Sequence, residues 1–551
     1  MLCLSLSCVG AAKVSRLAGP PPLVPRWAFE PWVWEDSQNT RAATEGLVDG
    51  YLSRGIPVGA VIVDSPWSTA YTNFEWDARR YPGAAEMVQG LHAKNVRVIL
   101  WLTGCLNITS KDVPQPDPEY DRVQALGFAV DDGRVIDWWK GRGRHLDFTS
   151  AAARALWAKR MDQVARLKID GWKVDQGEAY LPERFRTSVG EMDRDTFKNW
   201  YYSAIHDYAV SRNPEAITLA RPYSHQDGWA APIAKCSVGW SGDFSGDWGG
   251  IRLQLDNLYR SAAAGYGVLA VEVGGYYEKP PSKTELIRYA QLGALMPVMS
   301  NGGSNGGLKE HLPWFHDEET VRIYRDFATL HSELGDYLFS CAVDAHLGRG
   351  SVVRQPDSAR RQHLLGPDVF VSVVAGPELT KQVRTPAEGT WIDWWQQDRT
   401  YAPGTEFAYD VPLERYPIFV RAGAVIPMAT RLGALGNGNE ADAKRRALLV
   451  FPAGRSHRLC HLPLGTGTEY ADATIEVDED AGTIAVASQH ESQWRLRVKT
   501  FAQPAGVIGA TRWSYDAAAA WLTIDAAGAD VALKIVGLVG YGARARERSS
   551  R

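Results

Sequence analysis

From about residue 26 to residue 338, the chain repeats one pattern: a short apolar run, a polar loop and a helical stretch. Neighbouring parallel strands need a crossover between them, so this repeat predicts parallel β/α units. Eight such units in one stretch fit a closed (β/α)8 barrel better than an open sheet. Strands are expected at 27–34, 59–64, 96–102, 169–175, 216–221, 237–240, 267–271 and 294–299, and helices at 84–94, 151–167, 196–210 and 318–334.

Beyond about residue 340 the helical pattern stops, and short apolar runs alternate with turns rich in proline and glycine. This pattern is typical of sandwiched β-sheets. It predicts an all-β C-terminal part: a proximal β-sandwich over 339–432 and a distal β-rich domain over 433–540. Residues 1–25 are expected to be a leader or linker, and the basic, serine-containing tail 541–551 to be disordered.

Charge and cysteine usage exclude several classes of function. A net charge of -4 gives no support for nucleic-acid binding or for an anionic membrane surface. No apolar run approaches the length of a membrane span. The six cysteines have neither metal-ligand spacing nor a disulfide pattern, and no cofactor-binding motif is present, so neither a metal nor a cofactor is predicted. The compartment and the oligomeric state stay open.

The expected strand ends carry an unusual set of side chains. In a barrel of this type the chemistry lies at the carboxyl ends of the strands. Carboxylates accept hydrogen bonds from pairs of hydroxyls and tryptophan stacks on sugar rings, so the mouth of the barrel favours a neutral sugar; alternatively, some of the carboxylates pair structurally with Arg221 or Lys173. The residues at the eight ends are Glu35 and Asp36, then Asp64, Trp101, Asp175, Arg221, Asp243, Glu272, and last Ser300 and Asn301.

Two segments identify a family. They are Lys173-Val-Asp175-Gln-Gly-Glu178 after the fourth strand and Trp240-Ser-Gly-Asp243 after the sixth. Here the chain resembles glycoside hydrolase family 31, which includes α-glucosidases, α-xylosidases and α-galactosidases. The resemblance implies that Asp175 is the nucleophile and Asp243 the acid/base, and Asp243 is preferred to the nearby Asp247 on motif position.

Further motifs in the family's order extend the match over roughly residues 22–430. The segments around Asp64, Trp139, Arg221 and Tyr276 are similar to the family's sugar-binding segments, and two segments near 388–395 and 417–427 resemble its C-terminal β-sandwich. The substrate, an oligosaccharide or other α-glycoside, is accordingly expected to contact seven residues: Asp64, Trp101, Trp139, Lys173, Arg221, Trp240 and Tyr276.

Three departures limit what the resemblance implies about the sugar. The family normally has a β-sandwich before the barrel, whereas the first strand is expected here near residue 27, so this domain is expected to be missing. Glu272 stands where the family usually has aspartate. The segment Met299-Ser-Asn-Gly-Gly303 lacks the Arg-x-His that is often found there. The choice of glycone and leaving group therefore does not follow from the sequence.

The resemblance implies a retaining, exo-acting α-glycosidase that uses two carboxylates in a double displacement, α-glucosidase being the first choice. On a regular strand Lys173 points to the same side as Asp175 and favours its ionised form. Partial desolvation in a turn rich in tryptophan and glycine is expected to raise the pKa of Asp243. Two alternatives stay open: a carbohydrate-binding pseudoenzyme and an α-glucan lyase.

Overall fold

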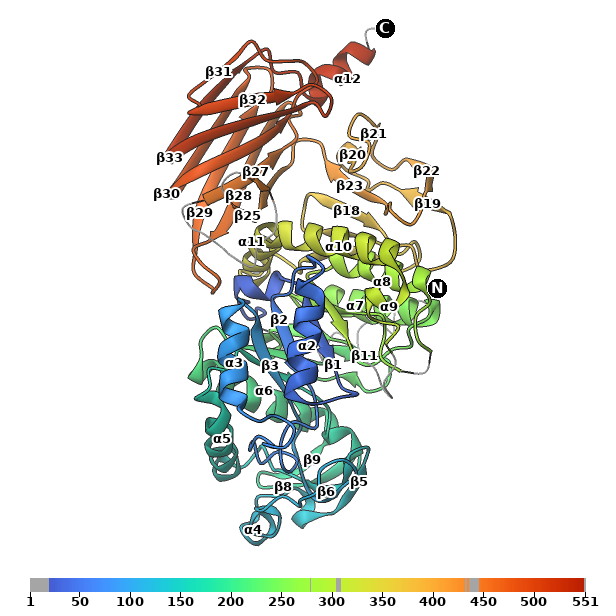
Figure 1. Ribbon diagram of the computed structural model, residues 1–551, viewed down its shortest axis with the longest axis vertical. Coiled ribbons are helices and arrows are strands. Elements are labelled where there is room, and N and C mark those ends of the chain that lie inside the picture. The colour runs from blue at the N-terminus through green and yellow to red at the C-terminus, as the bar shows by residue number, and fades with distance from the viewer. Residues whose placement is uncertain (1–18, 278, 304–308, 432–433, 436–444, 550–551) are drawn as a thin grey trace, which may run out of the picture.

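The computed structural model describes residues 19–277, 279–303, 309–431, 434–435 and 445–549. Figure 1 shows a barrel in the middle of an elongated molecule, β-sheets at one end and a small subdomain at the other. Eight parallel strands close the barrel in the order β1-β15-β14-β13-β10-β7-β3-β2, which confirms the predicted fold class. They are β1 (Trp32–Glu35), β2 (Ala60–Val63), β3 (Arg97–Leu102), β7 (Gly171–Val174), β10 (Ile217–Ala220), β13 (Val238–Trp240), β14 (Leu269–Val273) and β15 (Val298–Gly302).

Helices surround this barrel, and side-chain caps define where most of them begin. The side chains of Thr40, Ser150, Asp193, Ser282 and Asp317 each accept a hydrogen bond from the backbone N–H three residues later, which satisfies a donor that the helix leaves unpaired. The helices are α2 (Arg41–Leu52), α3 (Ala84–Ala93), α5 (Ala151–Ala165), α6 (Arg194–Arg212), α7 (Trp248–Ala264), α8 (Lys283–Ala294), α9 (Pro313–His316), α10 (Glu318–Glu333) and α11 (Gly335–His346).

Two strands begin four or more residues later than the sequence predicts. The first was expected at residue 27, but Arg26–Phe29 forms the 3-10 helix η1, because Pro25 and Pro31 flank it and the strand pairing starts only at Trp32. The last was expected at residue 294, but Ala294 still belongs to α8. Pro297 precedes β15 and cannot continue a helix, so the strand follows it directly.

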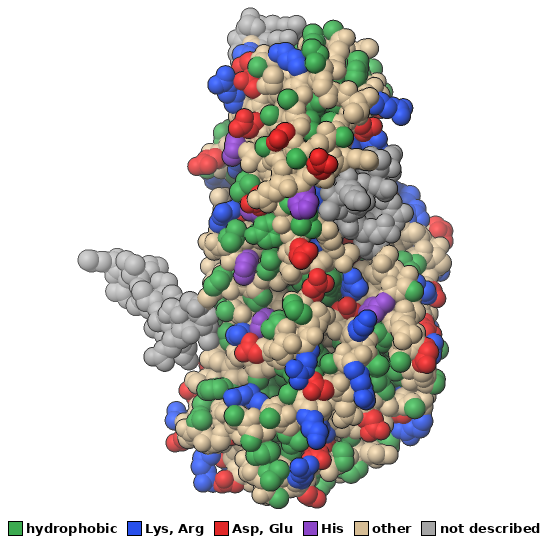
Figure 2. All heavy atoms as spheres, turned by 90° about the vertical axis from the view of Figure 1, so that its left-hand side faces the viewer, with side chains coloured by type: hydrophobic (Ala, Val, Ile, Leu, Met, Phe, Trp, Pro, Cys, Tyr) green, Lys and Arg blue, Asp and Glu red, His purple; other side chains and the backbone are tan. Residues whose placement is uncertain are grey.

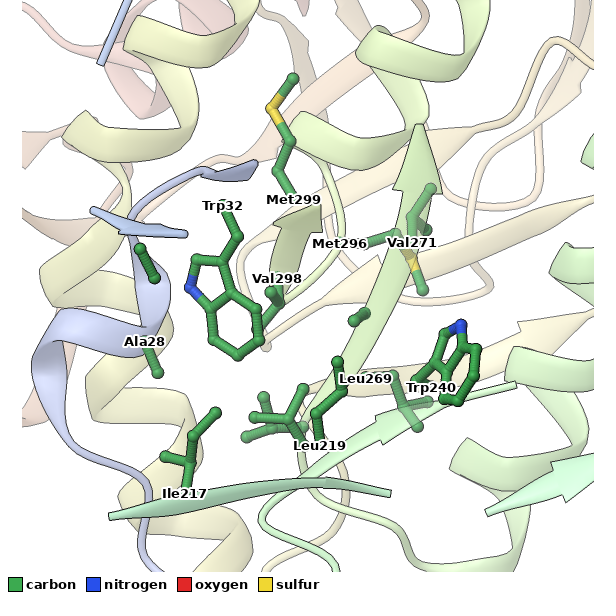
Figure 3. Packing of buried hydrophobic residues seen from close by; sticks show 14 of the residues in the cluster. Ala28, Trp32, Ile217, Leu219, Trp240, Leu269, Val271, Met296, Val298 and Met299 are labelled. Atoms are coloured by element: carbon green, nitrogen blue, oxygen red, sulfur yellow. The ribbon is translucent and has the colours of Figure 1, made fainter. Parts of the chain in front are cut away.

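Apolar side chains from neighbouring strands fill the barrel region. Figure 3 shows Trp32 of β1, Ile217 and Leu219 of β10, Leu269 of β14 and Val298 of β15 gathered in one region. All five have at most 1% of their surface exposed. This packed core fixes the strands, so that residues following their carboxyl ends are held in place.

Insertions after β3 and β7 build the small subdomain at the lower end of Figure 1. The first insertion forms the three-stranded sheet β4-β6-β5 and the second the hairpin β8-β9. Their elements are β4 (Cys105–Ser110), α4 (Tyr120–Ala125), η2 (Asp131–Gly133), β5 (Ile136–Trp138), β6 (Gly141–His145), η3 (Glu178–Tyr180), β8 (Arg184–Thr187) and β9 (Gly190–Asp193). A shorter insertion after β10 holds β11 (Tyr223–Ser224), β12 (Gly228–Trp229) and η4 (Ile233–Lys235).

The C-terminal part is built from β-sheets, as predicted. A six-stranded antiparallel sheet contains β16 (Val353–Asp357), β17 (Gln362–Leu365), β18 (Val369–Ser372), β20 (Trp391–Asp393), β21 (Thr400–Tyr401) and β23 (Ile418–Arg421). β19 (Thr380–Arg384) pairs with β22 (Glu406–Asp410), and β25 (Thr430–Arg431) with β26 (Ala434–Leu435). The distal sheet has its own apolar cluster around Trp494. Its strands are β24 (Val425–Met428), β27 (Arg445–Val450), β28 (Arg455–Pro463), β29 (Tyr470–Asp478), β30 (Thr483–Lys499), β31 (Gly506–Ile508), β32 (Arg512–Asp516) and β33 (Trp521–Val536).

A turn of this distal sheet reaches the amino-terminal segment of the barrel. The backbone N–H groups of Arg26 and Trp27 donate to the carbonyls of Gly467 (2.8 Å) and Thr466 (2.9 Å). The Arg97 guanidinium at the start of β3 donates to the Thr466 hydroxyl over 3.0 Å. A Cβ on Gly467 would lie 1.8 Å from a carboxylate oxygen of Glu215, so a larger residue at this contact would require the Glu215 side chain to move. The distal sheet is thereby attached to the base of the barrel.

The expectation of a disordered tail is wrong for residues 541–549, which form helix α12 (Tyr541–Ser549). Tyr541 packs edge-on against Phe501 at 5.0 Å and donates to the carbonyl of Gln397. A carboxylate oxygen of Glu479 accepts from the Ala543 N–H, as an N-cap side chain would. Residues 1–18, most of the predicted leader or linker, lie outside the described residues. Acidic and basic side chains are interspersed over the described residues of the face in Figure 2.

Candidate active site

A pocket of about 340 Å³ opens at the carboxyl ends of the barrel strands. Its floor is formed by buried charged and aromatic side chains, and its rim by residues of the loops after β5, β7, β10 and β14. Six of the seven predicted substrate-binding residues and both predicted catalytic residues line it. The lining residues are Trp34, Asp36, Asp64, Ser65, Trp101, Trp139, Lys140, Lys173, Asp175, Gln176, Tyr180, Arg221, Gln226, Asp243, Tyr276 and Tyr277.

Asp175 follows the last residue of β7, and donors surround its carboxylate. One oxygen accepts from the Arg221 guanidinium (2.9 Å) and from the Gln176 N–H (2.7 Å), and the other from the Trp101 indole N–H (3.0 Å). Burial by itself raises the pKa of Asp175, but the charges of Arg221 and Lys173 and these hydrogen bonds outweigh it, so the pKa lies below its ordinary value. These contacts favour the ionised form of Asp175.

Asp243 lies three residues beyond the end of β13, in a turn that requires glycine. Gly242 has φ +108°, and a Cβ there would come within 2.7 Å of an Arg221 nitrogen. The Asp243 side chain is 31% exposed, and one of its oxygens lies 4.0 Å from the same Arg221 nitrogen that binds Asp175. Burial raises the pKa of Asp243 to about 6, the Arg221 charge opposes this rise and the Asp175 charge adds to it. The pKa values of the two carboxylates are therefore shifted in opposite directions, although one Arg221 nitrogen lies near both.

Lys173 connects Asp64 to the floor of the pocket. Its ammonium donates to Asp64 over 2.8 Å and lies 3.5 Å from the ring centre of Trp34 and 4.5 Å from that of Trp240. Of the two structural partners that the sequence leaves open for the strand-end carboxylates, Lys173 and Arg221, Asp64 therefore pairs with Lys173. Trp240 is 1% exposed and does not line the pocket. It lies beneath the cations of Lys173 and Arg221 and supports them, in place of the predicted direct contact with substrate.

Trp34 and Tyr276 form one wall of the pocket, with ring centres 5.5 Å apart and nearly parallel planes. The Tyr276 hydroxyl donates to Asp36 over 2.6 Å. Burial, then the charge of Asp64, raises the pKa of Asp36 to about 7. A Cβ on Gly302 would lie 1.3 Å from the Trp34 indole nitrogen, so the indole occupies the space above the end of β15. This packing explains why small residues end the eighth strand.

Two other carboxylates near the strand ends do not line the pocket. Glu272 on β14 is 2% exposed, and burial, opposed by the Lys173 charge, raises its pKa to about 8. Asp247 accepts from the Gly250 N–H as the N-cap of α7 and pairs with Lys279 at 3.1 Å. The position of Asp247 is explained by its role as a helix cap. Of Asp243 and Asp247, only Asp243 lines the pocket.

Several lining residues were not predicted as sites from the sequence. They lie in loops or, for Tyr180, at the end of the short helix η3, where no periodic pattern shows which side chains turn inward: Gln176, Tyr180, Gln226, Tyr277 and Lys140. Their closeness to the predicted motifs was the available signal, since each is within four residues of a predicted site residue or of its motif. Trp34 is the last residue of the expected first strand, and Asp36 lies two residues after it.

Within the described ranges, no group of three or more His, Cys, Asp or Glu side chains has the arrangement of a metal site. In the same part of the chain, no helix has both the length and the apolar character required to cross a membrane.

Comparisons with known proteins agree with this architecture. The sequence model described as "Glycosyl hydrolases family 31 TIM-barrel domain" matches residues 21–341, and that of the "Glycosyl hydrolase family 31 C-terminal domain" matches residues 353–426. An α-xylosidase of Emericella nidulans is 26% identical over 445 residues, and "Alpha-glucosidase 2" of Bacillus thermoamyloliquefaciens is 23% identical over 522 residues. These alignments cover 76% and 88% of this chain.

The chain spans only part of the length of these relatives, 55% of the α-xylosidase and 64% of the α-glucosidase. Among solved structures, the cycloalternan-forming enzyme from Listeria monocytogenes superimposes with a TM-score of 0.84 at 22% identity. That superposition covers 96% of this chain and 56% of the other, and it shows that the fold is shared. Because the barrel model alone matches more than half of the sequence, the chain belongs to glycosyl hydrolase family 31.

Proposed function

We propose that this chain is a retaining α-glycosidase in which Asp175 is the nucleophile and Asp243 the acid/base. One observation carries the proposal: two carboxylates face one pocket, and their pKa values move in opposite directions from the ordinary value. Retention requires one ionised and one protonated carboxylate at a short separation, about 5–5.5 Å. Arg221, with one nitrogen 2.9 Å from Asp175 and 4.0 Å from Asp243, keeps the two close together.

The proposed reaction has two steps. In the first, an Asp175 oxygen bonds to the anomeric carbon while the protonated Asp243 gives its proton to the leaving oxygen, and a glycosyl ester forms. In the second, the ionised Asp243 takes a proton from a water molecule, which attacks the anomeric carbon and releases Asp175. Asp243 has to be both acid and base, and a pKa of about 6 suits both tasks near neutral pH.

The pocket suits the terminal sugar of a neutral glycoside. Asp64, Asp36 and Arg221 offer acceptors and donors for hydroxyls, and Trp34, Trp101 and Tyr276 offer ring faces. Because the floor is closed by buried side chains, an exo-acting cleavage of terminal α-linked sugars is favoured over cleavage within a chain. Glucose is the proposed glycone, supported by the similarity to the α-glucosidase; the α-xylosidase makes xylose the first alternative.

The first experiment is a panel of 4-nitrophenyl α-glycosides with the purified chain, followed by proton NMR of the first sugar released. We expect hydrolysis of the α-glucoside and a product that is initially the α-anomer. A β-anomer formed first would contradict the assignment of Asp175 as nucleophile. Sugar binding without turnover of any member of the panel would instead indicate a carbohydrate-binding pseudoenzyme.

Two variants separate the roles of the carboxylates. Asp175→Ala should be inactive towards every substrate, because no ester can form. Asp243→Ala should keep more activity towards a glycosyl fluoride than towards a disaccharide, because fluoride needs little protonation to leave. Azide should then accelerate turnover and yield an α-glycosyl azide, since azide attacks without losing a proton. If azide has no effect and both substrates are lost equally, Asp243 is not the acid/base.

A further inference from the structure

The pocket changes in character from its floor to its mouth. The floor residues Asp64, Lys173, Asp175 and Arg221 are at most 8% exposed, whereas Tyr180 on the rim is 40% exposed. A sugar bound over Asp175 would be enclosed by the floor. Any group attached to that sugar would leave the pocket past the rim, so the rim residues are those that can contact the leaving group.

Two aromatic rings from different insertions meet on this rim. Trp139 follows β5 and Tyr180 ends η3, and their ring centres are 5.5 Å apart with planes tilted by 42°. Trp139 also packs edge-on against Trp138 at 4.7 Å. Both rings line the pocket, and among the residues that the structure describes no hydrogen bond or ion pair of the Tyr180 side chain explains why so large a ring is left in contact with solvent.

Asn107 holds the backbone on both sides of Trp139. Its side-chain oxygen accepts from the Trp138 indole N–H (2.8 Å), and its side-chain nitrogen donates to the Lys140 carbonyl (3.2 Å) and to the Ser110 hydroxyl (3.0 Å). Asn107 is fully buried. A buried amide whose donor and acceptor are both used fixes the segments it joins, so Trp139 sits in a loop that is anchored at each neighbour.

Arg194, at the start of α6, has the corresponding role for Tyr180. One guanidinium nitrogen donates to the carbonyl of Ala179 (2.6 Å) and to that of Leu181 (3.1 Å). These carbonyls flank Tyr180 in the chain. Each of the two rim rings therefore belongs to a backbone segment that one polar side chain holds on both sides of the ring. Asn107 holds the segment of Trp139, and Arg194 holds that of Tyr180.

We infer that Trp139 and Tyr180 form a rigid platform on which the leaving-group sugar of the substrate stacks, and that Asn107 and Arg194 are the positioning residues of this platform. The inference rests on the proposed function and identifies the substrate as a glycoside whose leaving group is itself a sugar ring. Rings that are fixed before binding lose little freedom when a sugar stacks on them, so the contact contributes to selectivity for oligosaccharides.

The same geometry gives a meaning to Asn107-Ile-Thr109, which matches the acceptor sequence for N-linked glycans. The nitrogen that would carry the glycan is buried and donates two hydrogen bonds within the platform support. A glycan at Asn107 is incompatible with this fold. The asparagine is required for the loop and not for modification.

The test compares two substrates with the same glycone. Maltose and isomaltose carry a sugar leaving group, whereas α-glucosyl fluoride carries none that can stack. For Tyr180→Ala we expect the ratio of kcat/KM for the disaccharides to kcat/KM for the fluoride to fall about tenfold. Tyr180→Phe, which keeps the ring, should restore the ratio. Trp200→Ala is the matched control, because Trp200 is 39% exposed on the outer helix α6 and should leave the ratio unchanged.

The positioning residues are tested by the same ratio in Arg194→Ala and Asn107→Ala. A change in stability alone would lower turnover of all substrates together, whereas loss of the platform lowers the ratio. If the Asn107 variant does not fold, the Arg194→Ala variant still tests the role of the positioning residues, because Arg194 is partly exposed. An unchanged ratio in both Tyr180→Ala and Arg194→Ala overturns the inference.

Failure of the proposed function would be visible before any variant is made, as absence of turnover of the fluoride by the unaltered chain. Calorimetric titration with maltose and isomaltose would then test the platform by binding. We expect a fall in affinity of about tenfold for Tyr180→Ala and none for Tyr180→Phe. Equal affinities of the unaltered chain and Tyr180→Ala would overturn the inference in that case as well.

Discussion

Replacement of Arg221 by methionine should move both limbs of the pH profile of kcat/KM to higher pH, and by different amounts. Arg221 is 2% exposed, and its charge lowers the pKa of both Asp175 and Asp243. Methionine is unbranched and flexible like the arginine stem, but it is shorter and has no charge. The acidic limb reports ionisation of the nucleophile and the basic limb reports loss of the acid's proton, so each limb follows one carboxylate.

The distances set the expected sizes. At 4 Å and an effective dielectric constant of about 20, two unit charges interact by about 4 kcal/mol, equivalent to roughly three pH units. Asp175 lies closer, at 2.9 Å, and its side chain is buried, but Lys173 remains near it, so we expect the acidic limb to rise by about two pH units. Asp243 lies 4.0 Å from the Arg221 nitrogen and its side chain is 31% exposed, so solvent screens the effect of losing the Arg221 charge. We therefore expect the basic limb to rise by about one pH unit.

The assay is initial-rate hydrolysis of 4-nitrophenyl α-glucoside at low substrate concentration from pH 3 to pH 9, with Arg221→Lys as the control. The variant profile should be narrower, because its acidic limb moves further than its basic limb. Arg221→Lys keeps the charge, so its limbs should stay near those of the unaltered chain while kcat/KM falls. Loss of a substrate contact alone would lower the whole profile without moving it. Limbs that do not move in Arg221→Met would refute the electrostatic role of Arg221.

Three further variants test single features of the site. Asp64→Asn should lower kcat/KM about 100-fold and also the melting temperature, because the buried Lys173 loses its charged partner; unchanged activity with an unchanged melting temperature would remove Asp64 from the site. Gly242→Ala should cost about 1–3 kcal/mol in stability and at least tenfold in kcat, since it strains φ +108° and displaces Arg221; denaturant unfolding and initial rates check both. Asp247→Ala should lower stability by about 1 kcal/mol through the lost N-cap of α7 while kcat/KM stays within about twofold, and a loss of 100-fold or more would reopen the assignment of Asp243.

The sequence predicts the barrel well because its strands are apolar runs that end at polar residues. Asp64, Asp175 and Arg221 each follow directly on a strand, so their place at the mouth of the barrel could be inferred from chain position. The direction of a side chain could not be inferred where the strand end is short or irregular. Trp240 ends β13 as predicted, yet its ring lies beneath two cations and not in the pocket.

Contacts between segments that are distant in the sequence could not be predicted from sequence patterns. Nothing in the local sequence distinguishes Lys173 from Arg221 as the partner of Asp64, because the choice depends on how β2, β7 and β10 are placed around the barrel. The backbone on both sides of Tyr180 is held by Arg194 of α6, a contact that the local sequence does not show. Helix α12 was missed because a basic composition was interpreted as disorder, whereas contacts made by Tyr541 stabilise it.

The contact between the turn at Thr466 and Gly467 and the segment at Arg26 and Trp27 has a consequence for how the chain is made. These partners are separated by most of the sequence, so the amino-terminal segment leaves the ribosome long before its hydrogen-bonding partners exist. Contacts between such distant segments form late because a long loop has to close first. The barrel is thus expected to mature only after synthesis is complete, and a chain ended at residue 444 should accumulate in a soluble, protease-sensitive form or aggregate.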